Sequence, residues 1–312
     1  MNRTALAAVT VAYLGTGLSI ALAQTAPAPP VGPDWSKVTV TTTDLGHRTY
    51  MLSNGMSGNV TIAVGDDGII MVDGQHAPMH DRLKEAIGKI SPLPIKFLVN
   101  THLHGDHTGG NVAFGKDGVT IVAHENVKKR LASGNISNLS GAQNPPLPAE
   151  GLPGRSYESG SITLEVKGRS AKLTHPEHAH TDGDTYVYFA DANVLSTGDT
   201  FNNGHYQNSD WINGGNLAGM VAAIDTYMTF INDQTKIVPG HGPLANKAQL
   251  KEFRDMVDAS LIRMKTLIAT GDIKSEADAI AAKPFDDFDN KWAANEQSAK
   301  NWIRIVYNSA KQ

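Results

Sequence analysis

Residues 99–111 read V-N-T-H-L-H-G-D-H-T-G-G-N, and this stretch decides the fold. Three histidines and an aspartate fall within six consecutive positions of it: His102, His104, Asp106 and His107. The apolar run Ile95–Val99 before them predicts a buried strand that ends at the cluster. Side chains two positions apart in an extended segment point the same way, so His102 and His104 can bind one ion together.

The pattern H-x-H-x-D-H after a buried strand is a strong indication of a metal site. The alternative is ordinary surface histidines, which would require three of the chain's 12 histidines to gather beside an acid by accident. Gly105 allows a turn inside the pattern, so Asp106 and His107 can face a second point. Because the chain has no cysteine, any metal site must use histidine and carboxylate ligands.

Four ligands in one loop cannot complete two tetrahedral sites, so other segments must supply the rest. Three later segments each place a histidine or an aspartate in a loop beside a predicted strand: 178–184, Gly198–Thr200 and 240–243. Loops at the C-terminal ends of strands meet at one edge of a sheet. The sequence therefore predicts that these segments converge on the histidine cluster at that edge.

The order of the predicted elements indicates the fold class. Short β-branched or aromatic runs within 38–72 predict strands, and apolar residues then recur at helical spacing over 79–90. A second series of strands within 162–196 is followed by amphipathic helices. Strands then helices, twice over, predict two sheets packed face to face with helices outside. The segment 133–159, rich in Gly, Asn, Pro and Ser, is expected to be irregular and either functional or mobile.

Composition limits the partners of the chain. It has 312 residues, of which 40% are hydrophobic, enough for a sizeable core. The formal net charge is −4 and the isoelectric point is about 6.3, so no global basic field favours nucleic acid. A small-molecule substrate is the expected partner, and the sequence leaves the oligomeric state open.

The N-terminus has the features of a signal peptide. A positive charge lies near its start, residues 5–22 are almost wholly apolar or small, and A-L-A at 21–23 is a cleavage signal. We expect residues 1–23 to be removed and the mature protein to be periplasmic or secreted, without stable membrane insertion; a retained membrane anchor is the alternative. A Pro-rich linker, 24–36, and a single folded domain, 37–312, with a C-terminal helical extension are expected to follow.

Taken together, the motifs resemble those of the metallo-β-lactamase-fold hydrolases. The resemblance implies an α/β (α+β) chain, a four-layer αββα sandwich of two mixed β-sheets flanked by helices. The resemblance runs from Val38 to about Leu250. It rests on five motifs in order: Asp73 ending a strand, the H-x-H-x-D-H run, His180 with its following Thr and Asp, Asp199, and His241. His178 competes with His180 for its place, and the family pattern of His, Thr and a carboxylate favours His180.

The resemblance implies a dinuclear metal site. Carried over position by position, the first metal would be bound by His102, His104 and His180, the second by Asp106, His107 and His241, with Asp199 bridging the pair. The family implies a bridging hydroxide as the nucleophile, and Asp106 would also pass a proton to the leaving group, so Asp106 and Asp199 are the catalytic candidates. Asp73 resembles the aspartate that braces the histidine loop in the family; a plain turn residue is the alternative.

The ligand set also bears on the metal and the reaction. Nitrogen and oxygen ligands without sulfur suit zinc, and also iron or manganese. Relatives with di-iron redox chemistry usually have Glu where this chain has His104, which favours two Zn²⁺ ions and hydrolysis. The family thus implies an exported dinuclear zinc hydrolase that cleaves a small-molecule ester, lactone, thioester or amide.

Two alternatives stay open: a metallo-β-lactamase that opens β-lactam rings, and a non-hydrolytic metal- or ligand-binding protein on the same fold. One β-lactamase subclass uses a cysteine ligand, and this chain has none. The subclass that matches Asp106, His107 and His241 lacks the bridging acid found at Asp199. Lactonases, thioesterases and phosphodiesterases of this fold do carry that aspartate.

Two aromatic residues beyond Asp199 are candidates for a substrate pocket. Tyr206 can donate a hydrogen bond to an oxyanion, and Trp211 can line the pocket. For each of them, ordinary packing in the loop is the alternative. The remaining histidines have no ligand spacing and are expected to have surface or core roles: His47, His76, His80, His124, His175 and His205.

Overall fold

The computed structural model describes residues 33–312, and Trp35–Gln312 form one compact unit. The predicted signal peptide, 1–23, and most of the predicted linker, 24–36, lie outside the described residues. The last two linker residues belong to a short 3-10 helix, η1 (Trp35–Lys37). Between residues 33 and 312, no helix has both the length and the apolar composition that a membrane crossing requires.

The first sheet has seven strands and mixed pairing. Strands β1 to β4 pair in antiparallel fashion, whereas β4, β5, β6 and β9 run parallel. In their order across the sheet the strands are β1 (Thr41–Gly46), β2 (Thr49–Ser53), β3 (Val60–Val64), β4 (Ile69–Val72), β5 (Ile95–Val99), β6 (Thr120–His124) and β9 (Arg155–Tyr157).

The second sheet has five strands and is also mixed. Its first four strands are antiparallel to their neighbours, and the last pair, β13 and β14, is parallel. The strands follow chain order: β10 (Ser161–Val166), β11 (Arg169–Thr174), β12 (Tyr186–Phe189), β13 (Val194–Ser196) and β14 (Lys236–Val238). A separate two-stranded hairpin consists of β7 (Asn135–Ile136) and β8 (Gln143–Asn144).

Side-chain alternation explains how the first sheet faces two core layers. Because successive side chains of a strand point to opposite faces, an apolar strand can pack on both sides. In β4, Ile69 and Met71 pack with helix α1 (His80–Ile90), whereas Ile70 and Val72 pack against side chains of the second sheet. The two sheets therefore lie face to face with a shared core between them.

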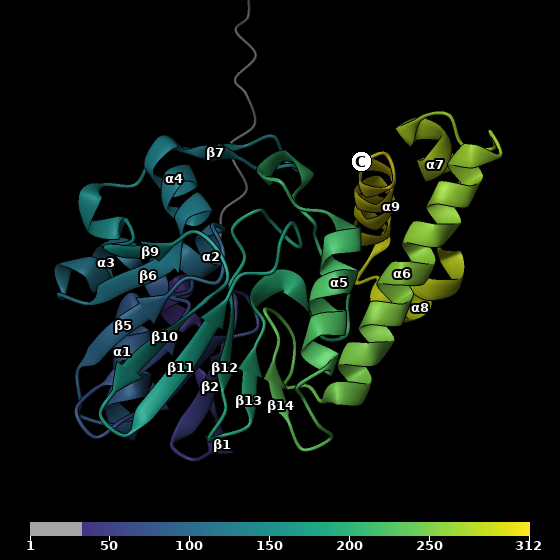
Figure 1. Cartoon of the computed structure of the whole chain (residues 1–312). Helices are drawn as coiled ribbons and strands as arrows, with labels where there is room; N and C mark the ends of the chain where they lie inside the picture. The colour runs from purple at the N-terminus through teal and green to yellow at the C-terminus, as the bar shows by residue number, and fades with distance from the viewer. Residues whose placement is uncertain (1–32) are drawn as a thin grey trace, which may run out of the picture. The chain divides into compact units, whose positions relative to one another are not determined.

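Helices cover the outer face of each sheet (Figure 1). On the second sheet these are α5 (Leu217–Met228), α6 (Lys247–Ala269) and α9 (Glu296–Ala310), which share one apolar cluster with β12, β13 and β14. The predicted four-layer αββα sandwich of two mixed sheets is confirmed. The remaining helices are α2 (Gly105–Thr108), α3 (Asn111–Lys116), α4 (Glu125–Ser133), α7 (Glu276–Ala282), α8 (Asp286–Trp292), η2 (Ala77–Met79), η3 (Ala149–Gly151), η4 (Gly198–Thr200) and η5 (Trp211–Asn213).

Strand direction collects the chemically active loops at one edge of the sandwich. Because β4 and β5 are parallel, Asp73 and His102 follow strands that end at the same edge. In the second sheet, β13 and β14 are parallel, so Asp199 and His241 also follow strands that end together. His180 lies in the loop that leaves the C-terminal end of β11, which runs in the same direction as β13.

The segment 133–159 is more regular than its composition predicts. It contains the β7–β8 hairpin, the 3-10 turn η3 and β9, which extends the first sheet by pairing parallel to β6. Three residues are too few to show alternation in the sequence, so β9 gave no periodic signal. The expectation of an irregular segment was therefore wrong for these stretches.

Candidate metal centre

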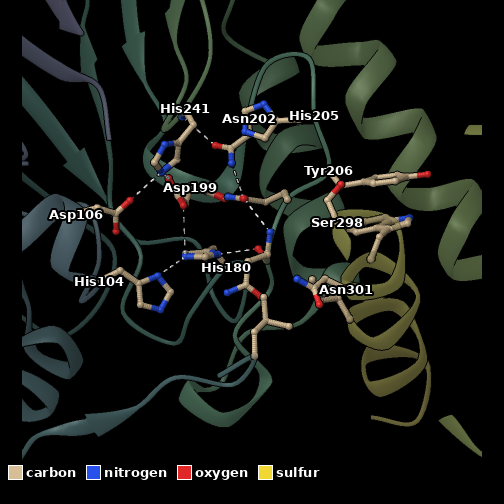
Figure 2. A pocket seen from close by; sticks show the side chains of 15 residues that line it. His104, Asp106, His180, Asp199, Asn202, His205, Tyr206, His241, Ser298 and Asn301 are labelled. Carbon is tan, nitrogen blue, oxygen red and sulfur yellow. Dashed lines mark hydrogen bonds and ion pairs between the residues drawn. The ribbon is translucent and has the colours of Figure 1, made fainter. Parts of the chain in front are cut away.

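The loops at this edge bring together two sets of three ligand-type side chains. Figure 2 shows four of these six side chains, His104, His180, Asp106 and His241. The first set, named the His102 group, is His102, His104 and His180. The second set, named the Asp106 group, is Asp106, His107 and His241. Within each group the candidate ligand atoms lie within 4.8 Å of one another. His178, the competitor for His180, is exposed and points elsewhere, with Nδ1 3.1 Å from the Gly214 carbonyl oxygen.

Asp199 lies between the two groups. Its Oδ2 is 3.8 Å from His180 Nε2, on the side of the His102 group. Its Oδ1 is 3.2 Å from His107 Nε2 and 3.5 Å from His241 Nε2, on the side of the Asp106 group. One carboxylate oxygen thus faces each group, which is the arrangement that a bridging ligand requires.

Hydrogen bonds on the far side of the rings orient the His102 group. His104 Nε2 donates to Asp210 Oδ2 at 2.9 Å, and His180 Nδ1 donates to the Asn208 carbonyl oxygen at 2.7 Å. A neutral imidazole that donates from one nitrogen presents a lone pair at the other. The inner nitrogens, His104 Nδ1 and His180 Nε2, lie 2.9 Å apart, so the two lone pairs face one another.

This arrangement fits a metal ion. Two imidazole lone pairs at such a distance repel unless a cation or a proton lies between them. His102 Nδ1 lies 3.0 Å from Thr101 Oγ1, while its Nε2 is buried and has no hydrogen-bond partner within residues 33–312. Buried polar atoms are almost always paired, so a buried imidazole nitrogen without a partner, next to other histidines, fits the role of a metal ligand. Nitrogen and carboxylate donors are those that zinc, iron and manganese accept.

A second carboxylate, that of Asp73, supports the Asp106 group through a hydrogen bond to His107. His241 Nε2 lies 3.0 Å from Asp106 Oδ2, and His107 Nδ1 donates to Asp73 Oδ2 at 2.8 Å. Asp73 also accepts hydrogen bonds from the backbone N–H and the hydroxyl of Thr101, both at 2.8 Å. Asp73 is buried and has a φ of 63°, a backbone conformation that Asp and Asn tolerate better than most residues. The Asp73 side chain therefore fixes the histidine loop through Thr101 and His107.

The two groups differ in charge. Burial lowers the pKa of His180 to about 4 and holds the pKa of His102 well below its usual value. Burial would also lower the pKa of His107, but the charges of Asp199, Asp106 and Asp73 outweigh it and raise that pKa well above the usual value. The pKa of His241 is raised in the same way, against burial, chiefly by Asp199. Without metal, His102 and His180 are therefore neutral and can offer a lone pair to a metal ion. His107 and His241 instead favour the protonated, positively charged form, which the neighbouring carboxylates stabilise.

Two glycines explain why the motifs read G-D and G-H. At Gly198, with a φ of 52°, a Cβ atom would lie 2.5 Å from Thr101 Cβ. At Gly240 a Cβ atom would lie 1.9 Å from Asp199 Oδ1. Only glycine lets these two loops approach closely enough to place Asp199 and His241 at the site.

A cavity of about 380 Å³ opens onto both groups (Figure 2). Across the cavity from the histidines lies α9, which contributes two polar and two apolar side chains. The lining residues are His104, Asp106, Leu139, His180, Asp199, Asn202, His205, Tyr206, Gln207, Asn208, His241, Ser298, Asn301, Trp302 and Ile305. The pocket therefore has one wall of candidate metal ligands and one wall of mixed polar and apolar side chains.

The two aromatic candidates for the pocket have different placements. Tyr206 lines the cavity, but its hydroxyl donates to Asp289 Oδ1 at 2.7 Å and its ring stacks on Trp302 at 4.9 Å. Trp211 is not among the residues that line the cavity, and instead packs against the apolar cluster of α5, α6 and α9. Trp211 therefore lies outside the lining of this cavity, whereas Tyr206 lines it with a hydroxyl that is already bonded to Asp289.

Sequence reasoning missed several residues that support the site. Asp210 and Asn208 hold the outer nitrogens of His104 and His180, and no spacing pattern links them to the histidine cluster. The Gln207 side chain donates to the Asp199 carbonyl oxygen, and accepts from Asn202 Nδ2 at 2.5 Å. The side chains from α9 come from a segment about which the metal motifs contain no information.

The chain belongs to the metallo-beta-lactamase superfamily, whose family model matches residues 53–245. That range contains all seven ligand candidates, and it ends before the C-terminal helices. The solved metallo-beta-lactamase from Pontibacter korlensis has the same fold, with a TM-score of 0.59 and 19% sequence identity. The match covers 70% of this chain and 99% of that protein.

Three relatives are similar over 55–60% of the chain. The 2,4-dinitroanisole O-demethylase subunit alpha of Nocardioides sp. (strain JS1661) is 28% identical over 174 residues, and the match spans 49% of that protein. The probable metallo-hydrolase YqgX of Bacillus subtilis (strain 168) is 26% identical, with 86% of it covered. The hydroxyacylglutathione hydrolase of Polaromonas sp. (strain JS666 / ATCC BAA-500) is 25% identical, with 62% covered.

Proposed function

We propose that this chain is a dinuclear zinc hydrolase that cleaves an ester, lactone, thioester or amide bond in a small molecule. The observation that carries the proposal is the position of Asp199, with Oδ2 toward the His102 group and Oδ1 toward the Asp106 group. The superfamily membership and the hydrolase names of two relatives support it.

Each group of side chains would hold one ion. His102, His104 and His180 would bind the first ion, Asp106, His107 and His241 the second, and Asp199 would contact both. When bound, two divalent ions lower the pKa of a water from 15.7 toward about 7, which makes hydroxide available at neutral pH.

Asp106 is the side chain best placed to move a proton. It lines the cavity with a quarter of its side chain exposed, so it can reach a bound substrate. Burial would raise the pKa of Asp106, but the charge of His107 and the hydrogen bond from His241 outweigh it and lower that pKa. The carboxylate is therefore ionised at neutral pH and can accept a proton and return it to the leaving group.

The cavity favours small substrates. A volume of about 380 Å³ lies at the lower end of the range for small-molecule pockets. Ser298 and Asn301 offer hydrogen-bonding groups on α9, while Trp302 and Ile305 offer apolar surface. A substrate with a polar reacting bond and a short apolar part fits both walls.

A substrate panel on zinc-loaded protein tests the proposal. The panel contains an aryl ester, a lactone, a thioester, an amide, a β-lactam and an aryl methyl ether, the last because the name of one relative specifies an O-demethylase. We expect turnover of at least one among the ester, the lactone, the thioester and the amide, lost on chelation and restored by zinc. Turnover of the β-lactam alone would support the β-lactamase alternative, and turnover of none would support a binding protein.

We also propose that the chain is exported, on the strength of the signal-like segment 1–23. Fractionation of the native host should recover the protein outside the cytoplasm. N-terminal sequencing of that protein should begin at Gln24. A cytoplasmic protein that begins at Met1 would contradict export and leave the chemistry of the site untouched.

A further inference from the structure

The β7–β8 hairpin, residues 135–144, lies beside the metal centre and belongs to neither large sheet. Its residues are mostly exposed, yet Asn138 is only 7% exposed. The neighbouring Leu139 lines the cavity over the site. A polar residue buried in an otherwise exposed hairpin indicates a specific contact, and its partners lie in the loop after Asp199.

One hydrogen-bond route leads from the hairpin to His180. Asn138 Nδ2 donates to Asn208 Oδ1 and to the Ser209 carbonyl oxygen, both at 3.0 Å. Asn208 Nδ2 donates back to Asn138 Oδ1 at 3.2 Å. The carbonyl oxygen of the same Asn208 accepts the hydrogen bond from His180 Nδ1. The hairpin therefore fixes the backbone group that orients the His180 ring.

A second route leads from the same hairpin to His104. Asn213 Nδ2 donates to the Ile136 carbonyl oxygen at 2.9 Å and to Asp210 Oδ2 at 2.6 Å. Asp210 Oδ2 in turn accepts from His104 Nε2. Asp210 and Asn213 are fully buried, or nearly so, and water therefore cannot replace these contacts easily. Two of the three histidines in the His102 group are thus tied to one hairpin.

We propose that the β7–β8 hairpin sets the geometry of the His102 group, with Asn138 as its positioning residue. The proposal rests on the proposed function only in requiring that this group binds metal. The outer partners of metal-binding histidines fix ring orientation and tautomer, and their loss typically weakens metal binding about tenfold to a hundredfold. Because Leu139 forms part of the cavity, the same hairpin also contacts the space that a substrate would occupy.

Two substitutions separate hydrogen bonding from shape. Asn138→Ala removes the side-chain bonds, whereas Asn138→Asp keeps the shape and removes both donated bonds. If the side chain only fills space, Asn138→Asp should behave like the wild type. If it positions Asn208 by donation, Asn138→Asp should be impaired at least as much as Asn138→Ala.

Asn144→Ala is the matched control. Asn144 belongs to the same hairpin, is exposed, and donates from Nδ2 to Asn135 Oδ1 at 2.9 Å, so its loss perturbs the hairpin without touching either route. Both Asn138 variants and the control are compared with the wild type in full-length protein.

Cobalt(II) titration followed by visible absorption measures the metal sites one by one, since cobalt replaces zinc and its spectrum reports ligand geometry. We expect both Asn138 variants to bind cobalt at least about tenfold less tightly at one of the two sites, which we assign to the His102 group, with an altered spectrum at that site. Asn144→Ala should stay within about twofold of the wild type at both sites.

A nitrogen NMR spectrum of the histidines in metal-free protein gives a readout that does not depend on metal. Wild-type His180 should be the Nδ1–H tautomer, and the Asn138 variants should show a mixture. Unchanged cobalt binding and an unchanged His180 tautomer would overturn the inference and leave the hydrolase proposal intact. Failure of the wild type to bind cobalt would overturn the proposed function, and the inference with it.

Discussion

The His102 group and the Asp106 group lie on either side of Asp199, but they are built differently. The His102 group consists of imidazoles alone, and its outer hydrogen bonds to Asp210 and Asn208 lead to one loop and one hairpin. The Asp106 group mixes a carboxylate with two imidazoles and rests on Asp73, close to the first sheet. The His102 group therefore depends on the β7–β8 hairpin for its geometry, whereas the Asp106 group depends on Asp73, which directly follows β4.

This difference predicts how strongly protons compete with a metal ion at each group. Burial makes His102 and His180 neutral, so a metal finds free lone pairs there. His107 and His241 have raised pKa values, so a metal must displace protons that neighbouring carboxylates stabilise. Metal affinity at the His102 group should therefore depend mainly on the residues that orient its rings. Metal affinity at the Asp106 group should depend mainly on pH.

The largest effect is expected from Asp199→Ala, which removes the side chain that the two groups share. Turnover should fall by more than about a hundredfold, because a directly contacting ligand matters more than an outer partner. Bound zinc should fall below the wild-type value while the circular-dichroism spectrum stays unchanged. Full turnover in this variant would show that Asp199 does not bridge.

A pair of outer-carboxylate variants should separate the groups. Asp73→Asn places an amide N–H₂ where Asp73 Oδ2 or Oδ1 accepts hydrogen bonds, so it should weaken metal binding at the Asp106 group by about a hundredfold and lower the melting temperature. In Asp210→Asn the amide oxygen can stay on His104, and the N–H₂ group then replaces only Oδ1, which accepts the longer 3.2 Å bond from the Asn213 backbone N–H. This variant should therefore weaken the His102 group by only about tenfold. The measurement is zinc affinity by competition with a chromophoric chelator.

The backbone gives this pair an internal control. Asn tolerates the left-handed conformation at position 73, so a loss of stability in Asp73→Asn reflects hydrogen bonds and not backbone strain. Equal losses of zinc affinity from the two variants would contradict the assignment of one brace to each group.

Lowering the pH should increase the difference in zinc affinity between the two groups. The pKa values of His107 and His241 are raised, so these rings take up protons at higher pH than an ordinary histidine, and zinc affinity at the Asp106 group should fall as pH falls through those pKa values. The loss should be about tenfold per pH unit for each proton displaced. The pKa of His180 is about 4, so this ring stays neutral over the same range.

Zinc titrations at about pH 8 and about pH 6 measure this difference, since ordinary histidines titrate between these values. We expect the weaker of two sites to lose affinity steeply and the other to change little. Two sites with the same pH dependence would show that the charge difference between the groups does not control binding.

The smallest effect is expected from Tyr206→Phe. Tyr206 lines the cavity but belongs to neither group of candidate ligands. The Tyr206 hydroxyl bonds to Asp289, so its loss should cost about 1 kcal/mol of stability and change kcat by less than about threefold. A drop in kcat of tenfold or more at unchanged zinc content would show instead that the hydroxyl acts on the substrate.

The site was predictable where its ligands lie close together in the sequence or beside a strand end. His102 to His107 occupy one turn after β5, so spacing alone identified them. His180, Asp199 and His241 each lie in a short loop with glycine or threonine neighbours that the family resemblance made recognisable. Two packed sheets with helices outside followed from the switch between strand and helix periods, and the family resemblance implied the αββα layers.

The supporting parts were not predictable, for a physical reason. The Asn138–Asn208 bond joins residues 70 positions apart, and Asp210 lies 106 positions from His104. Such pairs form only when the sheets and loops are in place, and asparagine and aspartate are common in any loop. The wall provided by α9 has the same origin, since an amphipathic helix shows that one face is buried but not what it covers.

The most direct test of a two-metal centre is the zinc content of the wild-type chain. The protein is loaded with zinc, dialysed to remove weakly bound ions, and analysed for metal and protein concentration together. The arrangement of the His102 group, the Asp106 group and Asp199 predicts about two zinc ions per chain. A plateau at one ion or none would contradict it.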